Sequence, residues 1–186
     1  MMENTALILI DFQNDYFPGG VMVVDQPDQA VARAAKLLSV FRKQNLPIIH
    51  IQHENINPEL SFMLPGSNGQ KIHKSVEPQA SEQCFTKHYP NSFFKTDLDA
   101  YLKARGIEHL VISGMMTHMC VSATVRCSME NGFTATIIQD ACATLSLSLD
   151  GVKIPAETVH RTALAELTLL AEIKPLQRFL ADSLAS

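Results

Sequence analysis

The stretch HLVISGMMTHMCVSATVRC, residues 109–127, places a short apolar run directly before a helical pattern. Residues 109–114 have the length and composition of a strand buried on both faces, and residues 117–131 are typical of a helix. Gly114 lets the strand end without a side chain that would crowd the bend. Cys120 falls one turn into the helix, where backbone N–H groups and the helix dipole act on it. The stretch therefore predicts a strand-to-helix unit that carries a thiol at its turn.

The same alternation extends along the chain and decides the fold class. Further strands are predicted at residues 5–11, 47–53, 84–87 and 133–139, and further helices at 26–45, 96–106 and 155–171, with Pro155 at the first position of the last helix. Thr96 is the expected N-cap of the second of these helices, and residues 174–186 are read as a short strand or turn followed by a helix. Strands that alternate with helices indicate right-handed βαβ units and a parallel sheet covered on both faces. The 186 residues fit a single α/β domain spanning 1–186.

Composition excludes several classes of protein. A net charge of -4 disfavours nucleic acid as a partner, because nucleic-acid binding usually needs a basic face. No apolar run reaches the roughly 18 residues that span a bilayer. The N-terminus MMENTALILIDF lacks the basic region of a signal peptide, so a cytoplasmic location is expected. None of the four cysteines forms a C-x-x-C pair, which disfavours a zinc ribbon or a thioredoxin motif.

Three side chains able to carry out chemistry fall where predicted strands end. Ligands of open parallel sheets bind at the carboxyl ends of the strands, and this rule selects Asp11, Lys87 and Cys120. Each alone has an ordinary interpretation, as a strand-end acid, a surface lysine and a core thiol. Together they form a nucleophilic site in which the lysine and the helix start favour the thiolate. The carboxylate takes the thiol proton and returns it to a leaving amine.

Four segments in order resemble the motifs of the isochorismatase-like cysteine hydrolases: LILIDFQNDYF, FTKHYPNSFFKTDLDAYLKARGI, LVISGMMTHMCVSATVRCSMENGF and IIQDACAT. The resemblance runs from about residue 6 to residue 171. It implies a three-layer α/β/α fold whose six-stranded parallel sheet has the order 3-2-1-4-5-6. It also implies Asp11, Lys87 and Cys120 as catalytic residues and no cofactor. A cis peptide between Met115 and Met116 is implied as well, with the backbone N–H groups of Met116 and Cys120 forming an oxyanion hole.

The segment HIQHENINPEL, residues 50–60, bears on the branch of this family. Nicotinamidases carry a metal-binding Asp-x-His element shortly after the second strand, and that element is absent here. His50 and His53 are three residues apart, so a strand places them on opposite faces. No metal site is therefore expected. True isochorismatases cleave a vinyl ether without depending on a cysteine at this position, so Cys120 favours the amide-cleaving branch. In mechanism this chain resembles the N-carbamoylsarcosine amidohydrolases, the ureidoacrylate hydrolases and the streptothricin hydrolases.

The resulting hypothesis is a metal-independent cysteine hydrolase that cleaves a non-peptide C–N bond of a small amide through a thioester. The alternatives are a non-catalytic binding or assembly relative of the same fold, or an isochorismatase-type or nicotinamidase-type activity. The irregular residues 54–82 are a candidate lid. Members of the resembled family are commonly homo-oligomers, so a dimer or larger is expected. Side chains that could line a substrate pocket are Phe12, Gln13, Phe17, Tyr89 and His118.

Overall fold

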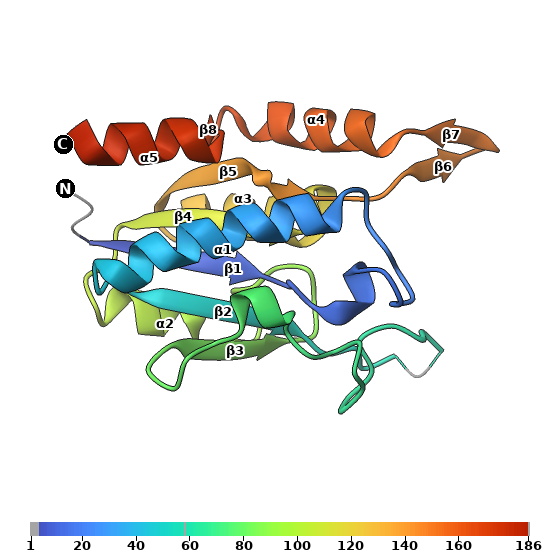
Figure 1. Cartoon of the computed structure of the whole chain (residues 1–186), viewed down its shortest axis with the longest axis horizontal. Coiled ribbons are helices and arrows are strands. Elements are labelled where there is room, and N and C mark those ends of the chain that lie inside the picture. Colours follow the sequence, from blue (N-terminus) through green and yellow to red (C-terminus); the bar gives the residue numbers. More distant parts are fainter. Residues whose placement is uncertain (1–3, 58, 186) are drawn as a thin grey trace.

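A six-stranded parallel sheet forms the centre of the molecule (Figure 1). The structure is a computed structural model that describes residues 4–57 and 59–185. The strand order β3-β2-β1-β4-β5-β8 confirms the predicted order, with β8 as the sixth strand. The strands are β1 (Thr5–Ile10), β2 (Ile48–His53), β3 (Gln83–Lys87), β4 (His109–Met115), β5 (Thr134–Ala143) and β8 (Glu172–Lys174).

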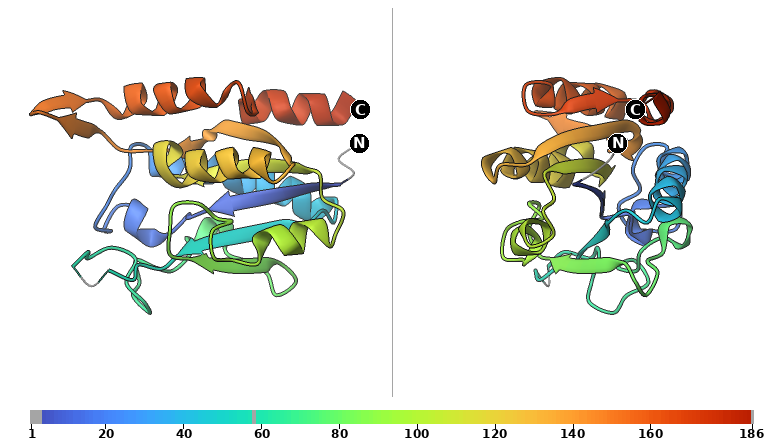
Figure 2. Two further views of the ribbon diagram at one scale, coloured as in Figure 1. Left: turned by 180° about the vertical axis from the view of Figure 1, so that it is seen from behind. Right: turned by 90° about the vertical axis from the view of Figure 1, so that its left-hand side faces the viewer.

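Helices cover both faces of this sheet, which confirms the three-layer α/β/α fold (Figure 2). The face covered by α1 (Pro27–Lys43) and α5 (Leu176–Ala185) receives Leu7 and Leu9 of β1. The face covered by α2 (Leu98–Lys103), α3 (Ser122–Glu130) and α4 (Ala156–Leu167) receives Ile8 and Ile10. Strand β1 is buried on both sides because successive side chains of a strand point to opposite faces. No helix of the described residues is both long and apolar enough to cross a membrane.

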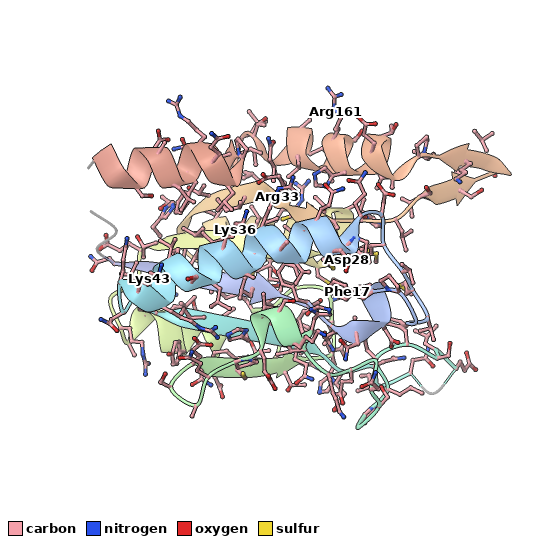
Figure 3. The ribbon with its side chains drawn as sticks, viewed as in Figure 1. Phe17, Asp28, Arg33, Lys36, Lys43 and Arg161 are labelled. Atoms are coloured by element: carbon pink, nitrogen blue, oxygen red, sulfur yellow. The ribbon has the colours of Figure 1, made fainter. Side chains whose placement is uncertain are left out.

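The covering helices are amphipathic. Leu37 and Leu38 of α1 are buried against the sheet, whereas Lys36 and Lys43 of the same helix are exposed to solvent. Arg161 of α4 likewise points away from the sheet (Figure 3). A one-sided apolar stripe of this kind is what a helix needs in order to pack on a sheet. The predicted helices are therefore held against the sheet by the burial of their apolar face.

Two local features differ from the expectations. Residues 147–154 form an antiparallel hairpin of β6 (Leu147–Leu149) and β7 (Val152–Ile154) that projects from the domain (Figure 1). Its turn, Asp150-Gly151, has positive φ at both positions, which is the signature of a tight hairpin turn. Asp97, not the predicted Thr96, takes the N-cap position of α2, but the Thr96 hydroxyl accepts the N–H of Leu98 at 3.4 Å and donates to the carbonyl of Ser92 at 2.6 Å.

Gly114 lies where β4 pairs with β1, and a Cβ at this position would lie 2.3 Å from the backbone oxygen of Ile10. One strand must shift to relieve such a contact, so we expect Gly114→Ala to lower the free energy of unfolding by about 2–4 kcal/mol. Gly132→Ala is the matched control, because Gly132 also has positive φ but has no atom within 4 Å of its added Cβ. Urea unfolding measures both. A loss at position 114 no larger than that at position 132 would contradict the close approach.

Candidate active site

The carboxyl edge of the sheet brings together the three residues selected from the sequence. Asp11 directly follows β1, Lys87 is the last residue of β3, and Cys120 lies in η3 (Thr117–Val121), the π-helical turn after β4. Lys87 Nζ lies 2.7 Å from Asp11 Oδ2 and 3.3 Å from Cys120 Sγ. The exposed fractions of Asp11, Lys87 and Cys120 are 0%, 1% and 6%. An acid, an ammonium and a thiol are thus packed against each other out of bulk water.

A fourth side chain, His53, completes the surroundings of the ammonium. Lys87 Nζ lies 3.2 Å from His53 Nδ1, and the two residues are partners in the pairing of β2 with β3. An ammonium has three N–H donors, and here Asp11, Cys120 and His53 provide an acceptor for each. Nδ1 accepts only in neutral imidazole, and burial together with the Lys87 charge lowers the pKa of His53 to about 4. The sequence analysis considered His53 only as a metal ligand and missed this contact.

Gln13 holds the end of β2 in place. Its Oε1 accepts the N–H of His53 at 2.8 Å, and its Nε2 donates to the carbonyl of His53 at 2.8 Å and to that of Gln70 at 2.7 Å. The side chain is fully buried. Its amide is therefore engaged with the main chain on both sides. Gln13 fixes the backbone of His53 and joins it to the 54–82 segment.

The charges of this cluster set the protonation state of the thiol. Burial and, to a lesser extent, the charge of Asp11 raise the pKa of Cys120 to about 12, although Lys87 acts in the opposite direction. Lys87 does favour the thiolate, as expected, but burial and the Asp11 charge, which the expectation left out, outweigh it and raise the pKa of the thiol. Burial alone would lower the pKa of Lys87, but Asp11 and Cys120 outweigh it, so that pKa is raised. The resting site holds a neutral thiol beside an ammonium–carboxylate pair.

Asp11 has the acceptor capacity that a thiol proton needs. Its Oδ1 is buried and has no hydrogen-bond partner among the described residues, while Oδ2 contacts Lys87. The backbone of Asp11 has φ 52°, a conformation that few residues other than glycine adopt. Its N–H donates to the carbonyl of Ile51 at 3.0 Å, which holds this bend against β2. The bend turns the carboxylate at the end of β1 towards Lys87.

The turn that carries Cys120 is tied to the end of β5. The Met115–Met116 peptide is cis, as predicted. Met116 occupies the N-cap position of this turn, and the Thr117 hydroxyl donates to the carbonyl of Ala143 at 3.1 Å. His118, expected to line a pocket, is half-buried, and its Nδ1 lies 2.5 Å from the hydroxyl of Thr144.

The aromatic side chains that were candidates to line a substrate pocket lie in different surroundings. Phe12 is buried in the core beneath α1, and Phe17 stacks on His73 with ring centroids 4.1 Å apart. Tyr89 packs edge-on against Phe94 at 4.9 Å. The Phe17–His73 pair helps to line a surface cavity of about 800 Å³ beside β2 and β3, whose lining contains none of Asp11, Lys87 and Cys120. That cavity is separate from the buried cluster.

The two histidines of β2 contact different side chains. His50 Nε2 lies 2.8 Å from Glu82 Oε2, and Arg42 binds the same carboxylate at 2.6 Å and 2.9 Å, whereas His53 contacts Lys87. Within residues 4–57 and 59–185, no three His, Cys, Asp or Glu side chains are grouped to hold a metal ion. His50 and His53 therefore bind protein groups on opposite faces of the strand.

The lowered pKa of His53 predicts how the free energy of unfolding depends on pH. An unfolded histidine titrates at about 6.5, above the folded value of about 4. As pH falls from about 6.5 to about 4, the unfolded chain binds the proton first, so stability is lost over this window. We expect His53→Gln to lose less free energy of unfolding than wild type between pH 7 and pH 4.5, by urea unfolding at both values. Equal losses would contradict a neutral His53 in the folded protein.

A parallel α/β/α domain with a thiol, an ammonium and a carboxylate at the carboxyl edge of its sheet is typical of one class of small hydrolase. The chain belongs to the isochorismatase family of hydrolases, because the Isochorismatase domain matches residues 5–173. It is similar to the uncharacterized isochorismatase family protein YddQ of Bacillus subtilis, with 45% identity over 95% of this chain and 98% of that protein.

A solved structure supports the same assignment. The putative isochorismatase hydrolase of Oleispira antarctica superposes with a TM-score of 0.91 at 42% identity, covering 97% of this chain and 98% of that one. A more distant relative is the maleamate amidohydrolase of Pseudomonas putida, 28% identical over 73% of this chain and 70% of that protein.

Proposed function

We propose that the protein is a cysteine amidohydrolase that cleaves the C–N bond of a small amide. The observation that carries the proposal is the position of Lys87 Nζ, 2.7 Å from Asp11 Oδ2 and 3.3 Å from Cys120 Sγ. A nucleophile and a proton acceptor held by one cation are the groups that acyl transfer requires. The name of the related maleamate amidohydrolase supports the choice of an amide as substrate.

In the first half-reaction Asp11 removes the thiol proton of Cys120 as the sulfur attacks the amide carbon. The raised pKa of the resting thiol is consistent with proton transfer during attack rather than before it. Lys87 offsets the negative charge that passes from the carboxylate to the sulfur. The carbonyl oxygen becomes an oxyanion, for which we propose the backbone N–H groups of Met116 and Cys120 as donors.

Collapse of the tetrahedral intermediate breaks the C–N bond. Asp11 returns its proton to the nitrogen, ammonia or an amine leaves, and Cys120 retains the acyl group as a thioester. In the second half-reaction a water molecule gives a proton to Asp11 and adds to the thioester carbon. The products are a carboxylic acid and the free thiol, which regains its proton from Asp11.

The proposed chemistry uses side chains and backbone groups alone. The absence of the Asp-x-His pattern in the sequence and the partners of the two histidines support a metal-independent reaction. His50 contacts Glu82, and His53 contacts Lys87. Neither ring is arranged with two further metal-binding side chains of the described residues.

A screen of small primary amides, with ammonia release as the readout, tests the proposal. We expect release from at least one amide, together with an acyl adduct in rapidly quenched samples. Mass mapping should place that adduct on the peptide that contains Cys120. Cys84 is the internal control, because it is the exposed cysteine of the chain and lies outside the cluster. An adduct on Cys84 alone, or hydrolysis without any adduct on Cys120, would contradict the mechanism.

We also propose a homo-oligomer. Helix α4 does not require a partner subunit, because Val159, Ala163, Leu164 and Leu167 are buried within the chain. The β6–β7 hairpin, in contrast, exposes Leu147, Leu149 and Val152, at 36%, 68% and 67%. We expect light scattering at micromolar concentration to give a mass of at least twice 20.5 kDa. A single 20.5 kDa species would contradict the proposal.

A further inference from the structure

The imidazole ring of His53 contacts the active site, yet the proposed mechanism gives it no role. His53 is the last residue of β2 and is half-buried. It is paired with Lys87 of β3, so the two side chains leave the sheet on the same side. Its Nδ1 lies 3.2 Å from Lys87 Nζ. This contact connects the ring to the reacting groups by way of the Lys87 ammonium.

The ring of His53 is itself held in place by two neighbours. Gln13 accepts the backbone N–H of His53 at 2.8 Å and donates to its carbonyl at 2.8 Å, which fixes the main chain from which the ring projects. Phe62 stacks on the ring, with centroids 5.9 Å apart and 6° between the two planes. A side chain fixed at its backbone and on its face is suited to hold another group at a defined position.

The ammonium of Lys87 needs such a fixed neighbour. It sits on a flexible four-carbon stem and can rotate about its last bond. Asp11 Oδ2 at 2.7 Å and Cys120 Sγ at 3.3 Å provide acceptors for two of its three N–H groups. With a third acceptor in place, any rotation or displacement of the ammonium weakens a hydrogen bond. A displacement of about 1 Å at a reacting centre can lower the rate about 100-fold.

We propose that His53 is a positioning residue of the active site: its Nδ1 accepts the third N–H of Lys87 and so holds the ammonium between the carboxylate of Asp11 and the thiol of Cys120. This inference rests on the proposed amidohydrolase function. The ring neither gives nor takes a proton in this role. It keeps the ammonium in contact with both groups while negative charge passes from the carboxylate to the sulfur.

A neutral acceptor suits this position better than a charged one. The pKa of His53, lowered to about 4 by burial and the Lys87 charge, leaves the ring neutral at pH 7. The ring proton is then on Nε2, and Nδ1 is free to accept. Asp11 and Lys87 already balance each other's charge. A second carboxylate here would add negative charge beside the thiol and oppose its deprotonation.

Three substitutions of His53 test the inference by ammonia release. The probes are acetamide, malonamide and benzamide, and the one that wild type hydrolyses fastest is used for every variant. His53→Leu removes the acceptor, and we expect kcat to fall about 10- to 100-fold while KM changes by less than about threefold. His53→Asn returns an acceptor near the place of Nδ1 and should recover kcat to within about fivefold of wild type. His53→Asp returns an acceptor with a charge and should be as slow as His53→Leu.

His50→Leu is the matched control, because it removes the other histidine of β2. His50 lies on the opposite face of the strand and contacts Glu82, which keeps Arg42 as a partner in the variant. We expect its kcat to stay within about twofold of wild type. Urea unfolding verifies that each variant is folded under the assay conditions.

A measurement on the ammonium itself separates this inference from the proposed function. The Lys87 ammonium of ¹⁵N-labelled protein is observed by NMR, and the exchange of its N–H protons with water is timed. We expect exchange about tenfold faster in His53→Leu than in wild type, and little change in His53→Asn and His50→Leu. If wild type hydrolyses none of the three amides while this difference is present, the amidohydrolase proposal fails and the holding of the ammonium by His53 stands. Equal exchange in wild type and His53→Leu, an unchanged kcat, a raised KM in place of a lowered kcat, or no recovery in His53→Asn would overturn the role of His53.

Discussion

Cys120→Ala is expected to lower kcat/KM for amide hydrolysis by at least about 10³-fold, because no other group can form the thioester. The side chain is small, and its sulfur contacts Lys87 Nζ at 3.3 Å while the ion pair of Lys87 with Asp11 is independent of it. We therefore expect the fold and the ion pair to be retained. Ammonia release measures the rate, and circular dichroism with urea unfolding verifies the fold.

Two variants make this result specific to the thiol. Cys120→Ser keeps the shape of the side chain and should be nearly as inactive as Cys120→Ala, because a hydroxyl loses its proton much less readily than a thiol. Cys84→Ala removes the exposed cysteine and should keep activity within about twofold of wild type. Residual activity of Cys120→Ala above a tenth of wild type would show that hydrolysis uses another nucleophile or an activated water.

The grouping of an acid, a lysine and a cysteine at one edge of the sheet was predictable, because the rule that selects these residues needs no side-chain geometry. Asp11, Lys87 and Cys120 each fall at or just after the carboxyl end of a strand, and parallel strands bring those ends to one edge. Alternating apolar runs and helical patterns suffice to locate such ends. The same reasoning identified the bend at Gly114, since a strand that passes directly into a helix leaves little room there.

What the sequence could not predict depends on register and burial. His53 contacts Lys87 because β2 and β3 pair with these two residues opposite each other, and register between distant strands is not visible in either segment. Whether the thiol is neutral depends on how deeply the site is buried, and burial outweighs the effect of Lys87 that the sequence indicated. Strand β8 has only three residues, too few to show a clear alternation.

The ion pair between Lys87 and Asp11 gives the second large effect. Both side chains have 0% exposure, and their charged atoms lie 2.7 Å apart. Removal of one partner leaves the other charge buried without its counterion, which typically costs about 3–5 kcal/mol. We expect Asp11→Asn and Lys87→Met each to lower the free energy of unfolding by this amount, as measured by urea unfolding at pH 7. Each should also abolish hydrolysis, because the proton acceptor or the compensating cation is lost.

The double variant Asp11→Asn/Lys87→Met separates stability from activity. It contains no buried charge at either position, so its loss of stability should be smaller than the sum of the two single losses by about 2–3 kcal/mol. Its activity should remain absent, since neither charge returns. The exposed pair of Lys103 with Asp99, 2.9 Å apart, is the control, and Lys103→Ala should change stability by about 0.5 kcal/mol or less. Additive losses in the double variant, or single losses no larger than that of the control, would show that the pair is not coupled. Hydrolysis by the double variant would show that catalysis does not need it.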